Sequence, residues 1–131
     1  MSTLIICAQD ISCISFGLLE DAHIVVEKTC QSEPEGYMQA LHQTLKEWSV
    51  PLERISALCV VTGPGAFTAS RVSVVMANTI AFARDLPLSA LENPEQVPLR
   101  DLIEKKGIPP SKKGVFAQPI YNRPPTITHP V

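Results

Sequence analysis

The sequence predicts an α/β domain in which a three-stranded antiparallel meander is followed by a helix, a strand, a helix and a strand. Three short apolar runs near the N-terminus are joined by turns of a few residues, and strands joined so tightly pair antiparallel. The apolar spacing then becomes helical over residues 38–48. Residues 55–88 have the pattern of a buried strand, a Gly-Pro-Gly turn, a helix with little charge and the start of another strand.

Composition excludes some functional classes. A chain of 131 residues can form one domain with its own core, and a net charge of -2 gives no reason to expect a nucleic-acid or membrane surface. The N-terminus lacks the basic start of a signal peptide and no segment approaches membrane-spanning length, so we expect a cytoplasmic protein. The cysteines form no CxxC pair and are expected to be reduced core residues, a disulfide or zinc set being the alternative: Cys7, Cys13, Cys30 and Cys59.

The first half of the chain supplies the meander and one helix. The strands are expected at residues 3–8, 14–19 and 23–29. Ser32 and Glu35 have the spacing of a capping box, with Pro34 in the first helical turn. The apolar side chains that follow recur at helical spacing and predict one packed face: Met38, Leu41, Leu45 and Trp48.

The second helix, expected over residues 69–84, is apolar on most of its circumference. Thr68 is a candidate N-cap, and Arg84 lies at the C-terminal end, where a cation complements the helix dipole. Small side chains would let another helix approach closely: Ser73, Ala77 and Ala81. The first helix could cover this side, or a second subunit could, and both can be true.

The composition changes after residue 93. Eight of the twelve prolines occur from Pro94 onward, which excludes long regular elements there. We expect a short helix within residues 95–106, a loop at 107–113, a short strand at 115–121 and an extended tail. The predicted division is therefore a lobe at residues 1–93 and a short extension at 94–131.

The Gly-Pro-Gly turn is the first candidate for chemistry. A glycine turn before a helix can bind anions, but this one lacks the lysine of a P-loop and the serine of a nucleophile elbow. The structural interpretation is stronger: Gly63 and Gly65 permit dihedrals that other residues avoid, and Phe67 fills the core. Asp10, after the first strand, is a candidate phosphate or metal ligand, although lone turn aspartates are more often caps.

The remaining polar residues give weaker signals. The three histidines show no ligand spacing, so we expect no metal site: His23, His42 and His129. A small basic cluster is interleaved with Asp101 and Glu104, which favours a solvated face over an RNA contact: Arg100, Lys105, Lys106, Lys112 and Lys113.

The string GPGAFTASR at residues 63–71 resembles the GPGSFTGLR motif of the TsaB (YeaZ) family. The opening LIICAQD, the alanine-containing helix followed by LPL, and the segment QPIYNRP at 118–124 are also similar to that family. The resemblance implies a single actin-like ATPase (ribonuclease H-like) lobe. The sequence departs from the family at Ile11, at Ala69-Ser70 and in having too few residues for a second lobe, so a one-lobe, truncated TsaB-like protein is expected.

The resemblance implies a non-catalytic scaffold in tRNA threonylcarbamoyladenosine biosynthesis. Such a protein docks a TsaD-like catalytic partner, or a second copy of itself, through the two helices of this lobe. A TsaE-like ATPase is a further partner that the resemblance allows. Transfer RNA is contacted only indirectly, and no cofactor, metal, catalytic residue or membrane is expected.

Two sets of residues follow from this expectation. The motif loop comprises Gly63, Pro64, Gly65, Phe67, Thr68 and Arg71. The partner or dimer interface is expected to include Met38, Leu41, Ser73, Ala77, Ile80, Ala81 and Arg84. Two alternatives stay open: a homodimeric divergent paralogue with another partner, and an ATP-binding phosphotransferase or hydrolase with Asp10 as its acidic group.

Overall fold

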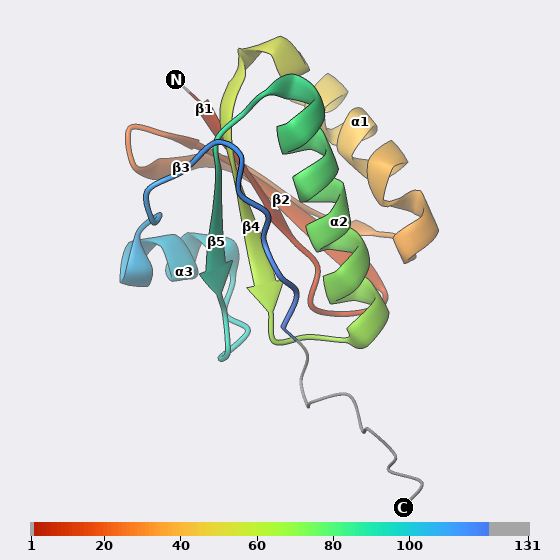
Figure 1. Ribbon diagram of the computed structural model, residues 1–131. Helices are drawn as coiled ribbons and strands as arrows, with labels where there is room; N and C mark the ends of the chain where they lie inside the picture. Colours follow the sequence, from red (N-terminus) through yellow and green to blue (C-terminus); the bar gives the residue numbers. More distant parts are fainter. Residues whose placement is uncertain (1, 121–131) are drawn as a thin grey trace, which may run out of the picture.

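The computed structural model describes residues 2–120 and contains one five-stranded mixed sheet with helices on both faces (Figure 1). The strand order is β3-β2-β1-β4-β5; β1, β2 and β3 pair antiparallel, whereas β4 pairs parallel with both β1 and β5. The element bounds are β1 (Ser2–Cys7), β2 (Cys13–Glu20), β3 (His23–Gln31), α1 (Tyr37–Glu47), β4 (Ile55–Gly63), α2 (Phe67–Arg84), β5 (Leu88–Glu92) and α3 (Leu99–Lys106). The predicted meander and the α-β-α-β order are confirmed.

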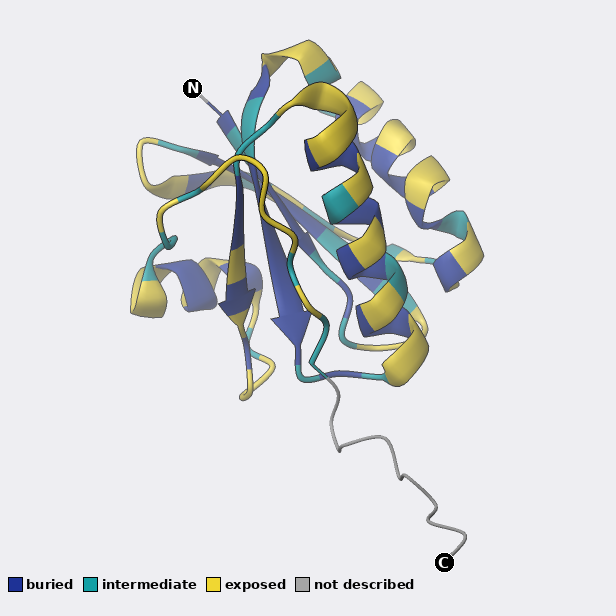
Figure 2. Ribbon diagram, in the orientation of Figure 1, coloured by how far each residue is buried: buried dark blue, intermediate teal, exposed yellow. Residues whose placement is uncertain are grey.

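Each face of the sheet has its own apolar cluster, because successive side chains of a strand point to opposite faces. Leu4 and Ile6 of β1 face α1 and α2, whereas Ile5 faces α3. The α3 side chains Leu99, Leu102 and Ile103 complete the second cluster. Figure 2 shows this burial along the central strands. Within residues 2–120, no helix is long and apolar enough to cross a membrane.

Both predicted helix caps are wrong. The Ser32 hydroxyl donates to the Glu33 carbonyl oxygen (2.9 Å), and Pro34–Gly36 form a 3-10 turn, so α1 begins only at Tyr37 and has no capping box. Thr68 lies inside the first turn of α2, which starts one residue earlier and has no side-chain cap. In both places a turn upstream of the helix supplies the backbone geometry that a cap would otherwise fix.

The extension after β5 also differs from the prediction. The helix in this region is confined to α3, because Pro98 lies at its N-terminal boundary. The described part of the predicted strand at 115–121 is not a strand; the antiparallel bridge in this region instead joins Leu88 and Lys112. The tail and the end of the QPIYNRP segment lie outside the described residues.

Candidate interaction surface

The Gly-Pro-Gly turn is packed tightly against the end of β1. A Cβ atom at Gly65 would lie 2.7 Å from the Cα atom and 2.8 Å from the carbonyl oxygen of Gln9, which is closer than side-chain carbons approach backbone. The Ala66 N–H donates to that same Gln9 oxygen (2.8 Å). Gly63 has a φ of 129°, a conformation that favours glycine. The turn therefore fixes the start of α2 against β1.

A partly buried polar network joins the ends of three strands. The Gln9 amide nitrogen donates to the carbonyl oxygens of Pro64 (2.7 Å) and Asn93 (2.8 Å). The Asn93 amide nitrogen donates to Gln9 Oε1 (3.0 Å) and to the Val97 carbonyl oxygen (2.9 Å), and Asn93 Oδ1 accepts from the Val97 N–H. These bonds occupy the polar groups of both side chains, so the network holds β1, β4 and β5 together.

A segment near the end of the described chain also packs at the edge of the sheet where β1, β4 and β5 end. Residues 115–120, here called the strap, run beside α2 and β4 (Figure 1). Asn78 of α2 makes a paired contact with Ala117, donating to its carbonyl oxygen (3.1 Å) and accepting from its N–H (2.8 Å). The Ile120 N–H donates to the Thr62 carbonyl oxygen (2.7 Å), and the Ile120 backbone occupies the space that a side chain at Gly63 would need.

Asp10 closes the turn between β1 and β2. Its carboxylate accepts hydrogen bonds from the Ser12 hydroxyl (2.6 Å) and N–H (2.8 Å). The Ser12 side-chain bond, followed by the backbone bond, lowers the pKa of Asp10. In the described part of the chain, no group of three or more His, Cys, Asp or Glu side chains could hold a metal ion.

The cysteines are free thiols. Burial raises the pKa of Cys7 to about 12 and that of Cys59 to about 11, so neither is present as a nucleophilic thiolate near neutral pH. Tyr37 has its hydroxyl buried without a hydrogen-bond partner, and burial raises its pKa to about 12.

An apolar groove lies between α1 and α2. It encloses about 370 Å³. Leu41 and Ile80 are buried in its walls, whereas Met38 is 56% exposed. Arg84 lies at the α2 end of the groove and pairs with Glu53 (3.4 Å). Four of the predicted interface residues therefore line one surface.

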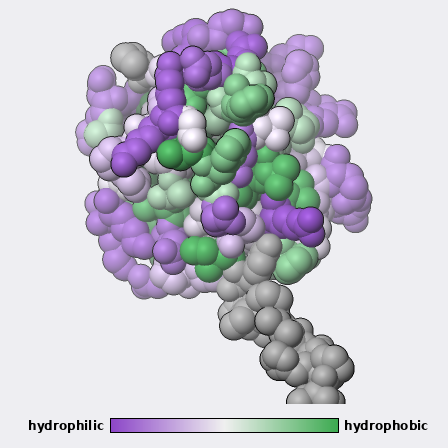
Figure 3. Space-filling view, viewed as in Figure 1, coloured by the Kyte–Doolittle hydropathy of each residue, from purple (hydrophilic) through white to green (hydrophobic). Residues whose placement is uncertain are grey.

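The other three predicted interface residues lie inside the protein. Ser73, Ala77 and Ala81 are buried on the inner side of α2, so they cannot themselves contact a partner. The small side chains instead let α2 lie close to the rest of the chain. Phe67, predicted to fill the core, is half-exposed, and Val75 and Phe82 are exposed as well. Hydrophobic side chains gather over α2 in the space-filling view (Figure 3).

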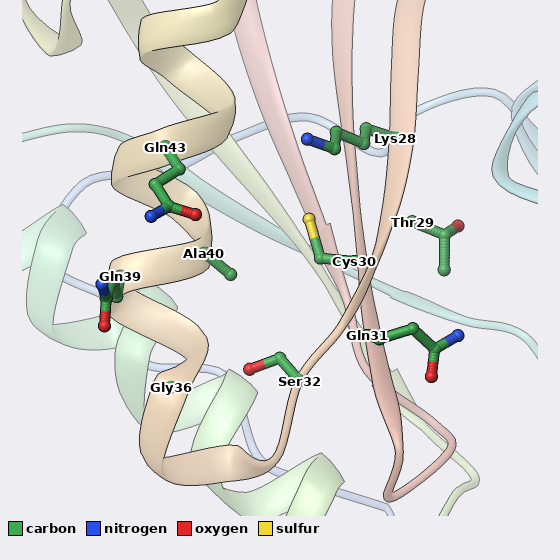
Figure 4. Close-up of a pocket in the computed structure, with 9 residues that line it drawn as sticks. All are labelled: Lys28, Thr29, Cys30, Gln31, Ser32, Gly36, Gln39, Ala40 and Gln43. Carbon is green, nitrogen blue, oxygen red and sulfur yellow. The ribbon is translucent and has the colours of Figure 1, made fainter.

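A polar cleft of about 410 Å³ lies on the other side of α1, against β3 (Figure 4). The Cys30 and Lys28 side chains approach it from β3, with Gln39 and Gln43 on α1. Lys28 Nζ pairs with Glu47 Oε2 (2.6 Å), which joins the edge strand to the helix. No spacing pattern in the sequence indicates this cleft, because its walls come from two elements whose packing is not a local property.

Comparison with known proteins agrees with these observations. Residues 25–110, more than half of the chain, match the family model described as TsaD, tRNA N6-adenosine threonylcarbamoyltransferase. The chain belongs to this family. A curated relative, the tRNA threonylcarbamoyladenosine biosynthesis protein TsaB of Bacillus subtilis, is 34% identical over 58 residues, which cover 44% of this chain and 25% of the relative. The recognition of a TsaB-like chain is confirmed.

Solved structures confirm the ribonuclease H-like fold of this TsaD-family chain. YeaZ from Pseudomonas aeruginosa superposes with a TM-score of 0.61 at 22% identity, over 70% of this chain and 44% of YeaZ. A second structure, described as that of a protein with similarity to peptidase YeaZ from Pseudomonas aeruginosa, superposes with the same TM-score, and the match covers 43% of that protein. The chain thus spans less than half the length of the relatives that it matches.

Proposed function

We propose that this chain is an accessory, non-catalytic subunit in tRNA threonylcarbamoyladenosine biosynthesis, docking a TsaD-like catalytic partner through the α1–α2 groove. The groove carries the proposal because it combines an exposed methionine with a buried leucine and isoleucine on two adjacent helices. Methionine is adaptable and enriched at contact surfaces, and an apolar surface of this kind is typical of protein interfaces. A helix pair on the partner would complete a four-helix contact.

The filled carboxyl edge of the sheet supports an accessory role. In open α/β sheets, ligands bind where the carboxyl ends of neighbouring parallel strands meet. Here that position is occupied by the Gln9–Asn93 network, the Gly-Pro-Gly turn and the strap. The carboxylate of Asp10 is held by Ser12. The alternative of an ATP-binding phosphotransferase is therefore weaker, and tRNA is reached through the partner rather than through this chain.

Binding of the chain to the TsaD-like paralogue of the same organism tests the proposal. Co-expressed proteins should co-purify, and Met38→Glu should weaken the complex at least about 50-fold, because it puts a charge into an apolar contact. Val25→Glu is the matched control: Val25 is 55% exposed, against 56% for Met38, but lies on β3 outside the groove. Failure to co-purify, or equal affinity of the Met38 variant and the wild type, contradicts the proposal.

A calorimetric titration addresses the alternative function. The isolated chain is expected to give no heat of binding with Mg-ATP, because the carboxyl edge is occupied by its own residues. Saturable binding of Mg-ATP that Asp10→Asn abolishes would favour the phosphotransferase.

A further inference from the structure

The outer edge of β3 carries a row of backbone groups that no other strand uses. Within residues 2–120, β3 lies last in the strand order and pairs with β2 alone. The Ser32 N–H donates to the Ser12 carbonyl oxygen (3.0 Å), which fixes the alternation of bonded and outward-facing residues along the same register. The N–H and carbonyl groups of Glu27, Thr29 and Gln31 therefore point away from β2, and all three residues are exposed.

The N-terminal half of this edge is protected from further pairing. A guanidinium nitrogen of Arg100 on α3 donates to the Ile24 carbonyl oxygen (3.0 Å), and a bulge leaves Val25 outside the register with β2. Charged side chains and bulges are common devices that prevent another strand from adding to a sheet edge. In the C-terminal half, Lys28 is turned toward α1 and pairs with Glu47, so its side chain leaves the backbone there accessible.

This accessible half of β3 forms one wall of the polar cleft, and α1 forms the other (Figure 4). Cys30 projects toward α1, from which Gln39 and Gln43 line the opposite wall. A strand added to β3 would place every second side chain in the cleft, because alternate side chains of a strand share one face. The volume of about 410 Å³ is within the range of ligand pockets, and glutamine amides both donate and accept hydrogen bonds.

The charges beyond the C-terminal end of β3 favour a basic occupant. Glu33 and Glu35 line a hollow of about 690 Å³ that shares Gln31 and Ser32 with the cleft. Both glutamates are exposed, and among the described residues neither has an ion-pair partner and no basic side chain lines the hollow. Ile11, 48% exposed, offers apolar surface to the aliphatic part of an arginine or lysine.

We infer that the C-terminal half of the β3 edge binds an extended basic peptide of a protein partner by strand addition. The peptide runs antiparallel to β3 and pairs with the backbone of Glu27, Thr29 and Gln31. Basic residues at its N-terminal end reach Glu33 and Glu35. Main-chain hydrogen bonds supply affinity in this mode of binding, and the cleft selects the alternate side chains. The contact is separate from the α1–α2 groove, which lies on the other side of α1.

A synthetic peptide, Arg-Arg-Val-Thr-Val-Thr-Val, tests the inference by fluorescence anisotropy. In the antiparallel register its threonines enter the cleft and the N–H groups of its valines face β3. The peptide should bind saturably, and N-methylation of the valines should weaken binding at least about 100-fold, because it removes the pairing donors. N-methylation of the threonines is the matched control and should change the affinity less than about threefold. Absence of binding, or equal losses from the two modifications, overturns the inference.

Substitutions in the chain test the same contact from the other side. Thr29→Pro should abolish peptide binding, because it removes an outward N–H without breaking a bond to β2, whereas Thr29→Val should bind as the wild type does. The double variant Glu33→Gln/Glu35→Gln should weaken binding at least about tenfold at low salt. Asp101→Asn/Glu104→Gln, at exposed positions of α3, is its matched control. Circular dichroism should be unchanged in all four proteins.

Amide hydrogen exchange followed by NMR locates the peptide on the unmodified chain. The peptide should slow exchange at Thr29 and Gln31, whereas the amides of Lys28 and Cys30 already bond β2 and should change little. Met38→Glu should bind the peptide as the wild type does, which separates this inference from the proposed function. Protection confined to other elements, binding retained by Thr29→Pro, or binding lost in Met38→Glu overturns it.

Discussion

The carboxyl edge of the sheet and the outer surface of the two long helices use their side chains in opposite ways. At the edge, the polar side chains of Gln9 and Asn93 are turned inward and hydrogen-bonded to each other and to the backbone. On the helices, the apolar side chains of Met38, Val75 and Phe82 are turned outward. A hydrogen-bonded network that is partly buried fixes its neighbours in one arrangement, whereas exposed apolar area lowers the free energy only when something covers it.

This difference separates the distinctive part of the sequence from the part available for binding. The Gly-Pro-Gly turn is the string by which the family is recognised, yet Gly63 and Gly65 are used for close approach of the strap and of β1. The side chains that remain exposed on the helices are ordinary apolar residues. A recognisable motif thus sets the position of α2, whereas less distinctive apolar residues on α2 remain exposed.

The largest expected difference in stability is between two substitutions on α2, one at a buried position and one at an exposed position. Ala77 is fully buried and Val75 is half-exposed, only two residues earlier. Ala77→Glu buries an unpaired carboxylate and should lower the free energy of unfolding by about 4 kcal/mol or more. Val75→Glu should change it by no more than about 0.5 kcal/mol when measured on the monomer.

Urea titration followed by circular dichroism gives both values. A stable, folded Ala77→Glu protein would show that the inner flank of α2 is not part of the core. A large loss of stability in Val75→Glu would show that the outer face is covered within the monomer, and the contrast between edge and helices would then fail.

A double-mutant cycle on the Gln9–Asn93 network should give the next largest effect. Asn93→Ala removes the bonds to Gln9 and Val97 and should cost about 2–3 kcal/mol, because buried polar groups are left without partners. The cost of Gln9→Ala should be smaller in the Asn93→Ala background by about 1 kcal/mol. Chemical denaturation of the four proteins gives the coupling free energy.

An exposed hydrogen bond provides the control for this cycle. The Ser15 and Thr29 hydroxyls lie 2.7 Å apart across β2 and β3, where solvent can replace either partner. Thr29→Ala should therefore cost no more than about 0.5 kcal/mol. If Thr29→Ala and Asn93→Ala lower the free energy of unfolding equally, or if the effects of the Gln9 and Asn93 substitutions simply add, the network does not fix this edge of the sheet.

The fold was largely predictable because it rests on periodicity and on turn length. Apolar alternation and short turns are local properties, so the meander and the α-β-α-β order follow from the sequence and are found. The caps failed because Ser32 and Glu35 satisfy a local pattern that the 3-10 turn at Pro34–Gly36 overrides. Phe67 was misplaced because a helix that is apolar on most sides does not reveal which side meets the sheet.

The site was less predictable because it depends on contacts between distant residues. Gln9 and Asn93 are 84 residues apart, and neither belongs to a spacing pattern that would pair them. The contact of Asn78 with Ala117 spans 39 residues and depends on the path of the strap. Met38 and Leu41, which line the groove between α1 and α2, follow from helical spacing, whereas the burial of Ala77 and Ala81 depends on which flank of α2 meets the rest of the chain.

Asp10 should give the smallest effect, because it lies at the same edge but is exposed. Its pKa is lowered in the folded protein, so its ionised form is favoured and its contribution to stability is present above the unfolded value near 3.8. That contribution is lost as the pH falls through the folded pKa. The stability difference between wild type and Asp10→Asn should therefore be small at neutral pH and disappear in strong acid.

An NMR titration of the Asp10 carboxyl carbon, paired with urea titrations of both proteins at neutral and acidic pH, measures this linkage. A carboxyl that titrates above its ordinary value, or an Asp10→Asn protein with altered affinity for the TsaD-like partner, would mean that Asp10 does more than close a turn. The edge would then take part in binding together with the helices, and the separation between a structural edge and an interacting helix surface would not hold.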